Sequence, residues 1–273
     1  EVRLIPRDFR SVATGVGILV AQRYGAKDRE QLSVVIGNCI TLSAIVSVIT
    51  MIIGALITRP MLELLSTPAS IIDWCADYLM IYFLGIAGFA YYNILSGVLR
   101  GMGDSLSALG FLLVAAALNV GLDLWFVAGL GMGVAGAALA TTIALYLSWL
   151  ASILYARRNY EGLQFPLLPH GYDKAQLAAI LKVGVPLGLN NSLYSVGHVA
   201  VQAVYNMQGS VFVAGCSIAG RVTGIAGIAI TSFSSAAVVF AGQNLGAGNY
   251  RRLQRGVVQI TCAAGVVTLL IGL

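Results

Sequence analysis

Asn119 and Asp123 lie four residues apart in the otherwise apolar run 117–126. Side chains at this spacing project from the same face of a helix. An ionised residue at the centre of a bilayer costs about 2.5–3.5 kcal/mol on insertion scales, so its presence there indicates function. A carboxylate withdrawn from water accepts a proton more readily, and its oxygens also bind hard cations. The pair is therefore a candidate H⁺ or Na⁺ site. The alternative is a structural aspartate near the outer end of its span, beside the interfacial residue Trp125.

A second polar face follows Pro186, which should kink its helix. Its members recur at steps of three and four residues and so share one face: Asn191, Tyr194, His198 and Gln202. We expect this face to line a bundle interior or substrate cleft, with His198 either titrating or neutral and hydrogen-bonded. Arg221 is a further cleft candidate. It could pair with an acid, contact a lipid phosphate or lie closer to the membrane surface.

The composition is that of a membrane protein. Apolar residues make up 58% of the 273 residues and charged residues only 10%, against about a quarter in soluble domains. The mean hydropathy is +0.86. A soluble enzyme, a disordered chain and a disulfide scaffold are excluded. The four cysteines are scattered without a CxxC pair, so they suggest neither a zinc site nor a disulfide framework.

Apolar runs of roughly 20 residues predict membrane-spanning helices. The clear runs are 32–58, 72–99, 105–129, 133–156, 177–207, 211–241 and 253–273, after a shorter one at 11–22. The chain starts and stops within such runs, and we expect it to be a fragment.

Basic residues cluster in alternate loops. They are Arg23, Lys27, Arg29, Arg100, Arg157, Arg158, Lys174, Arg251, Arg252 and Arg255. The intervening loops hold only Arg59 with several acids. Because Lys and Arg are enriched in cytoplasmic loops, the first set is predicted to be cytoplasmic. The basic cluster within residues 1–10 does not follow this rule, and we give it little weight.

The chain contains an internal repeat. Gln22, Gly25 and Ala26 recur with the same spacing as Gln243, Gly246 and Ala247. Each copy ends one predicted span and opens the next on the same side, with an even number of spans between them. This predicts two parallel-topology bundles, as in transporters whose halves are related by an axis along the membrane normal.

Several motifs together resemble the multidrug and toxic compound extrusion (MATE) family. The segments are AQRYGAKD at 21–28, LRGMGDS at 99–105, LNVGLD at 118–123, GVAGAALATT at 133–142, VGVP at 183–186 and GQNLGAGNYRR at 242–252. Their order and spacing carry the resemblance over nearly the whole chain from about residue 11.

The resemblance implies an all-α, polytopic membrane protein of two six-helix bundles, incomplete here. Residues 1–156 would be the N-terminal bundle without its first helix, 157–176 a cytoplasmic linker, and 177–273 the start of the C-terminal bundle without its last three helices. It also implies that an Asn-x-x-x-Asp pair couples transport to a cation. Asn93 and Thr141 then match polar members of that network. From the sequence alone, a helix-packing hydrogen bond is the favoured interpretation of each, and only the resemblance makes membership of the network an equal alternative.

These features predict a secondary-active antiporter of the plasma (inner) membrane. It would export amphipathic or cationic organic compounds in exchange for H⁺ or Na⁺. We expect no cofactor beyond the coupling ion, no nucleic-acid partner and a monomer when complete. A lipid-linked precursor flippase is an alternative, although only Arg221 suggests the basic cavity it needs. A membrane-embedded enzyme is disfavoured, since the two histidines, His170 and His198, form no catalytic constellation.

Overall fold

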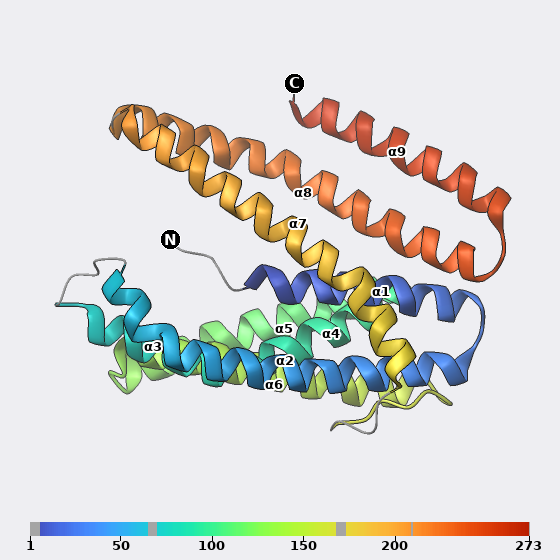
Figure 1. Ribbon diagram of the computed structural model, residues 1–273, viewed down its shortest axis with the longest axis horizontal. Coiled ribbons are helices and arrows are strands. Elements are labelled where there is room, and N and C mark those ends of the chain that lie inside the picture. Colours follow the sequence, from blue (N-terminus) through green and yellow to red (C-terminus); the bar gives the residue numbers. More distant parts are fainter. Residues whose placement is uncertain (1–5, 65–69, 168–172, 209, 273) are drawn as a thin grey trace. The chain divides into compact units, whose positions relative to one another are not determined.

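The computed structural model describes residues 6–64, 70–167, 173–208 and 210–272, and every regular element within them is helical (Figure 1). In chain order these are α1 (Pro6–Gly25), α2 (Arg29–Leu64), α3 (Ile72–Leu84), α4 (Ile86–Gly101), α5 (Ser105–Asp123), the π-helix η1 (Leu124–Gly129), α6 (Gly133–Asn159), α7 (Lys174–Met207), α8 (Ser210–Gly246) and α9 (Tyr250–Gly272). A helix satisfies its backbone hydrogen bonds internally, which a bilayer requires of apolar segments. The prediction of an all-α membrane protein is confirmed.

Five of the described helical segments are long and apolar enough to cross a membrane. The number becomes six if α3 and α4, bent by 47° at Gly85, form one broken span. α7 continues as one helix through Pro186. It is not among the apolar segments, because its polar side chains lower the mean hydropathy of the run 177–207.

The chain separates into two compact units. The α2–α6 unit comprises residues 29–100 and 104–180. The α1/α8 unit comprises α1 with the turn that follows it, residues 101–103, and the chain from Leu181 onward. The bundle boundaries expected at 156 and 177 stay a prediction.

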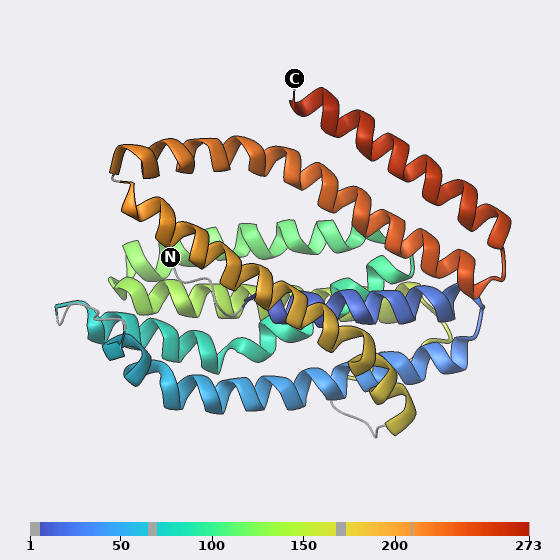
Figure 2. The same ribbon diagram turned by 45° about the horizontal axis from the view of Figure 1, so that its top comes forward.

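Within the α2–α6 unit, α3 packs against α2 and α6, while α5 runs beside α6 (Figure 2). Small residues permit these close approaches, as is common between membrane helices. Gly54 of α2 lies directly against the ring of Phe83, which is only 1% exposed. Between α6 and α5, Ser148 Oγ donates a hydrogen bond of 2.6 Å to the carbonyl oxygen of Phe111.

The described residues between α6 and α7 include two that are held against α2 in the same unit. The backbone N–H of Gln164 donates to Ser33 Oγ at 3.2 Å. The N–H of Asp173 donates to Asn38 Oδ1 at 2.9 Å. The carboxylate of Asp173 in turn accepts from the N–H of Ala175 at 2.8 Å and so caps the start of α7. His170 lies outside the described residues.

In the α1/α8 unit, α8 contacts both α1 and α9, and α8 and α9 follow each other as a hairpin (Figure 2). The predicted repeat has the same geometry in both copies. After α1, the N–H groups of residues 26, 27 and 28 donate to the carbonyls of residues 22, 24 and 23. After α8, those of 247, 248 and 249 donate to 243, 245 and 244.

Both copies therefore end in a Schellman turn, in which one residue adopts the left-handed conformation. That residue is Lys27 in the first copy, with φ of 58°, and Gly248 in the second, with φ of 67°. Lys27 has the only positive φ of any non-glycine residue in the described part of the chain. The two positions correspond, because each is the second residue after a matched glycine. The similarity of the two copies thus extends from sequence to backbone conformation.

Candidate ion-coupling site

Asn119 and Thr141 meet between α5 and α6. Asn119 Nδ2 donates to Thr141 Oγ1 at 3.1 Å. Thr141 Oγ1 in turn donates to the carbonyl oxygen of Ala137, one turn earlier on α6, at 3.0 Å. The threonine hydroxyl thus has a defined direction, with its lone pairs presented to Asn119. The structure brings these two predicted site residues together from different helices.

Asp123 is the last residue of α5 and directly precedes the π-helix η1. Such wide turns are rare and occur often at functional sites. Asn119 and Asp123 both belong to α5, so their side chains share a face. The side chain of Asp123 is only partly buried, yet its Oδ1 is fully shielded and has no hydrogen-bond partner among the described residues.

A shielded carboxylate oxygen without a donor is costly, because it has lost its water without gaining a protein hydrogen bond. A proton, a cation or a donor from another segment would complete it. The Asn119 amide, one turn earlier on the same face of α5, and the Thr141 hydroxyl of α6 that it contacts carry further oxygen atoms. Hard cations favour such oxygens.

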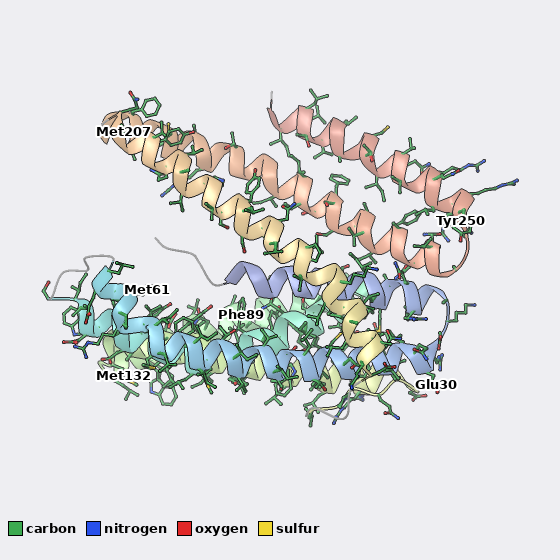
Figure 3. The ribbon with its side chains drawn as sticks, viewed as in Figure 1. Glu30, Met61, Phe89, Met132, Met207 and Tyr250 are labelled. Carbon is green, nitrogen blue, oxygen red and sulfur yellow. The ribbon has the colours of Figure 1, made fainter. Side chains whose placement is uncertain are left out.

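Asn93 lies on α4, and its Nδ2 donates to the carbonyl oxygen of Phe89 at 2.7 Å. Phe89 is labelled in Figure 3. This bond lies within one helix. In the described part of the chain, the Asn93 side chain makes no hydrogen bond to Asn119, Asp123 or Thr141. Its membership of the network stays a prediction.

The polar face of α7 borders a cavity of about 530 Å³, lined by Asn190, Leu193, Tyr194, Gly197, His198 and Val201. Tyr194 and His198, both predicted cleft residues, have ring centroids 5.7 Å apart. The other two predicted members, Asn191 and Gln202, are exposed but do not line this cavity. Asn190, which belongs to the same polar stretch of sequence after Pro186, does line it. It lies four residues before Tyr194, so the two side chains share one helix face.

Arg221 is exposed on α8, six residues before the apolar segment Gly227–Gly246 begins. No acidic side chain pairs with it among the described residues. The described lining of the α7 cavity does not include it.

A polar cluster that sequence reasoning did not single out surrounds Asp104, the N-cap of α5. Its carboxylate accepts from the N–H of Ser107 at 3.1 Å, from Tyr155 Oη at 3.0 Å and from Tyr160 Oη at 2.9 Å. Burial alone would raise the pKa of Asp104, but the hydrogen bonds from Ser107, Tyr160 and Tyr155 outweigh it and lower the pKa below its usual value. The signal available in the sequence was an aspartate immediately before an apolar run, which is typical of an N-cap.

Comparison with known proteins decides the family. The MatE family model matches residues 9–125 and 186–273. The chain belongs to the MATE family. It is 31% identical over 251 residues to the probable multidrug resistance protein YoeA of Bacillus subtilis (strain 168), covering 89% of this chain and 54% of that protein. It is also 24% identical over 263 residues to an FAD transporter of Shewanella oneidensis, covering 91% of this chain and 57% of that protein.

The MATE fold is also recognised in solved structures. The crystal structure of a MATE protein in complex with MaD3S matches 98% of this chain and 61% of its own chain, with a TM-score of 0.87 at 22% identity. This MATE chain therefore spans about half the length of the curated relatives described above. Membership places it in a family of transporters rather than of enzymes.

Proposed function

We propose that the complete protein is a secondary-active antiporter that exports amphipathic or cationic organic compounds in exchange for H⁺ or Na⁺. The single observation that carries the proposal is the shielded Oδ1 of Asp123, which has no hydrogen-bond partner among the described residues and lies one helical turn after Asn119, the donor to Thr141. It supports the proposal because a proton or Na⁺ bound at this carboxylate would supply the partner that Oδ1 lacks among the described residues. Membership of the MATE family supports the same activity.

Coupling requires the ion to bind one conformation better than the other, since a ligand shifts an equilibrium only by its differential affinity. One hydrogen bond to a charged group contributes about 1.5–3 kcal/mol. If the bond forms in one conformation only, it changes the equilibrium constant between the two conformations by roughly tenfold or more. Ion binding at Asp123 would act on the wide turn of η1 directly after it, and so on the outer end of this span. Alternating access about a central cleft would then release substrate outward.

The proposal includes the plasma membrane as the location, with the basic loops cytoplasmic and the complete protein a monomer. The α7 face would contribute to the substrate cleft through Tyr194 and His198. A flippase would need a basic cavity for phosphates. The described lining of the α7 cavity contains neither Lys nor Arg, so no observation favours that alternative.

The test is dye efflux from everted vesicles that carry the complete protein, with pH and Na⁺ gradients imposed separately. Asp123→Asn keeps the size of the side chain and removes its charge, and should reduce gradient-driven efflux to the level of empty vesicles. The matched control is Asp77→Asn, an exposed carboxylate of α3 in the same unit, which should leave efflux unchanged. Loss with one gradient only identifies the coupling ion. Efflux that persists in Asp123→Asn contradicts the assignment.

A further inference from the structure

The two copies of the repeat touch each other directly, through matched residues. A methyl group added at Gly25 would overlap the carbonyl oxygen of Gln243 and lie 2.7 Å from its carbonyl carbon. A methyl group added at Gly246 would overlap the carbonyl oxygen of Gln22 and lie 2.8 Å from its carbonyl carbon. Gln22 corresponds to Gln243 in the repeat, and Gly25 to Gly246. The two contacts therefore exchange when the copies are exchanged, as in an interface with local two-fold symmetry.

Neighbouring positions extend this contact along α1 and α8. A methyl group at Gly242 would lie 2.7 Å from Cβ of Ala21. One at Gly101 would lie 2.7 Å from the carbonyl oxygen of Gly17 and 2.9 Å from Cγ1 of Val20. Val20 and Ala21 are fully buried.

A side-chain hydrogen bond joins residues 101–103, the third segment of this unit, to α8. Gln243 Nε2 donates to the carbonyl oxygen of Gly101 at 3.0 Å. Residues 20–25, 101–103 and 242–246 thus form one junction inside the α1/α8 unit, which we call the repeat junction. Three of the sequence motifs meet there.

This geometry suits a contact that forms and separates as a unit. At Gly25 and Gly246 the backbone of one helix packs directly against the backbone of the other. Closing the contact therefore orders few side chains and leaves little room for water between the helices. Close-packed contacts have discrete arrangements and do not deform gradually. The ends of α1 and α8 carry loops whose basic residues predict the cytoplasmic side.

We propose that the repeat junction is the closure of the transporter on the side predicted to be cytoplasmic. It is made when the protein is closed to that side and separates when it opens there. This inference rests on the proposed alternating-access function. It adds which residues form the closure and why Gly25 and Gly246 must be glycine.

The test uses Val20→Cys as a reporter in the complete protein with its other cysteines replaced. The substitution makes a buried side chain smaller and keeps it within the junction. A thiol reacts with a membrane-impermeant maleimide only when it becomes accessible. In everted vesicles, the rate of labelling therefore reports how often the junction opens.

Gly25→Ala and Gly246→Ala should each accelerate labelling about fivefold or more, since overpacking of this kind shifts an equilibrium by at least that factor. The reciprocal geometry predicts similar effects for both. The control is Gly37→Ala, where an added methyl group meets nothing within 4 Å, and labelling should be unchanged. Unchanged labelling in both junction variants would overturn the proposal.

Gln243→Glu is a second test that adds no bulk, and it decides the matter if the glycine variants fail to reach the membrane. It removes the donor to Gly101, so labelling should accelerate. Its repeat counterpart, Gln22→Glu, should have a smaller effect because the Gln22 side chain makes no equivalent hydrogen bond within the described residues. Equal labelling in wild type and both variants again contradicts the proposal. Labelling does not depend on efflux, so failure of the antiporter assignment would be seen separately, as absent efflux with a normal labelling response.

Discussion

Replacing Asp104 with alanine should lower the free energy of unfolding by about 3 kcal/mol. The substitution removes the helix cap, in which the Asp104 carboxylate accepts a hydrogen bond from the Ser107 N–H. This cap contributes about 1 kcal/mol. The hydrogen bonds from Tyr155 and Tyr160 would contribute about 1.5–3 kcal/mol each if the carboxylate were fully shielded from water. Because the aspartate is partly exposed, solvent screening reduces each to about 1 kcal/mol.

The effect of this substitution should depend on pH. The folded protein holds the pKa of Asp104 below its usual value, against the opposing effect of burial, through the hydrogen bonds from Ser107, Tyr160 and Tyr155. A depressed pKa stabilises the folded state above the unfolded pKa of about 3.9. That contribution is lost as the pH falls through the lower folded value. The difference between wild type and Asp104→Ala should therefore be constant near neutral pH and shrink below about pH 4.

The measurement is thermal unfolding of the purified complete protein in detergent, for wild type, Asp104→Ala, Tyr155→Phe and the double variant. Substitutions of two residues that share a hydrogen bond do not have additive effects on stability. The coupling energy between Asp104 and Tyr155 should be about 1 kcal/mol. Asp77→Asn serves as the exposed-carboxylate control and should change stability by less than about 0.5 kcal/mol. If Asp104→Ala falls within that same range, or if its effect does not change with pH, the reasoning is refuted.

One further prediction concerns the Asn119–Thr141 contact, and two concern the left-handed residues of the repeat turns. Thr141→Val leaves the Asn119 amide without its acceptor, at a cost of about 1–3 kcal/mol. The apparent affinity for the coupling ion should fall about tenfold, while Thr141→Ser should retain wild-type affinity; equal affinities in both variants, measured by ion-dependent efflux, would exclude this role. At the repeat turns, Gly248→Ala should lower the free energy of unfolding by about 1 kcal/mol, because Gly248 is left-handed. Lys27→Gly should raise it by about 0.5 kcal/mol, since relief of the left-handed lysine exceeds the added unfolded-state entropy. A neutral Gly248→Ala in thermal unfolding would show that the turn is not strained.

Much of the local structure could be predicted from the sequence. The apolar runs predicted the helices, since hydropathy reflects the cost of exposing polar groups to lipid. The region 72–99 was expected as one span, but Gly85 divides it into α3 and α4 with a 47° bend. The run 177–207 is one helix, yet its polar face makes it less apolar than the other spans. The mean hydropathy over a window of residues does not reveal a bend within a span. It also does not show which neighbouring segment a polar helix face contacts.

Part of the candidate site could also be predicted. The spacing of Asn119 and Asp123 on one helical face follows from the period of the helix. The partner of Asn119 is Thr141, and the resemblance to the MATE family, not any local pattern, indicated it. Asn93 stays a predicted member of the same network, and the hydrogen bond of its side chain to Phe89 lies within α4. An asparagine in an apolar helix can bond to its own backbone or to a neighbour, and spacing does not distinguish the two.

The sequence by itself determined the helical, membrane-embedded character of this protein, its internal repeat and the shared face of Asn119 and Asp123. These depend on composition and on periodicity along a single helix. Only the tertiary structure decided that Asn119 contacts Thr141 and that Gly25 and Gly246 meet the carbonyls of the opposite repeat. It alone also showed that Oδ1 of Asp123 is shielded and has no hydrogen-bond partner within the described part of the chain. The rotation and separation of two packed helices depend on how the side chains of both fit together. That fit is a property of the packed pair and is absent from either segment alone.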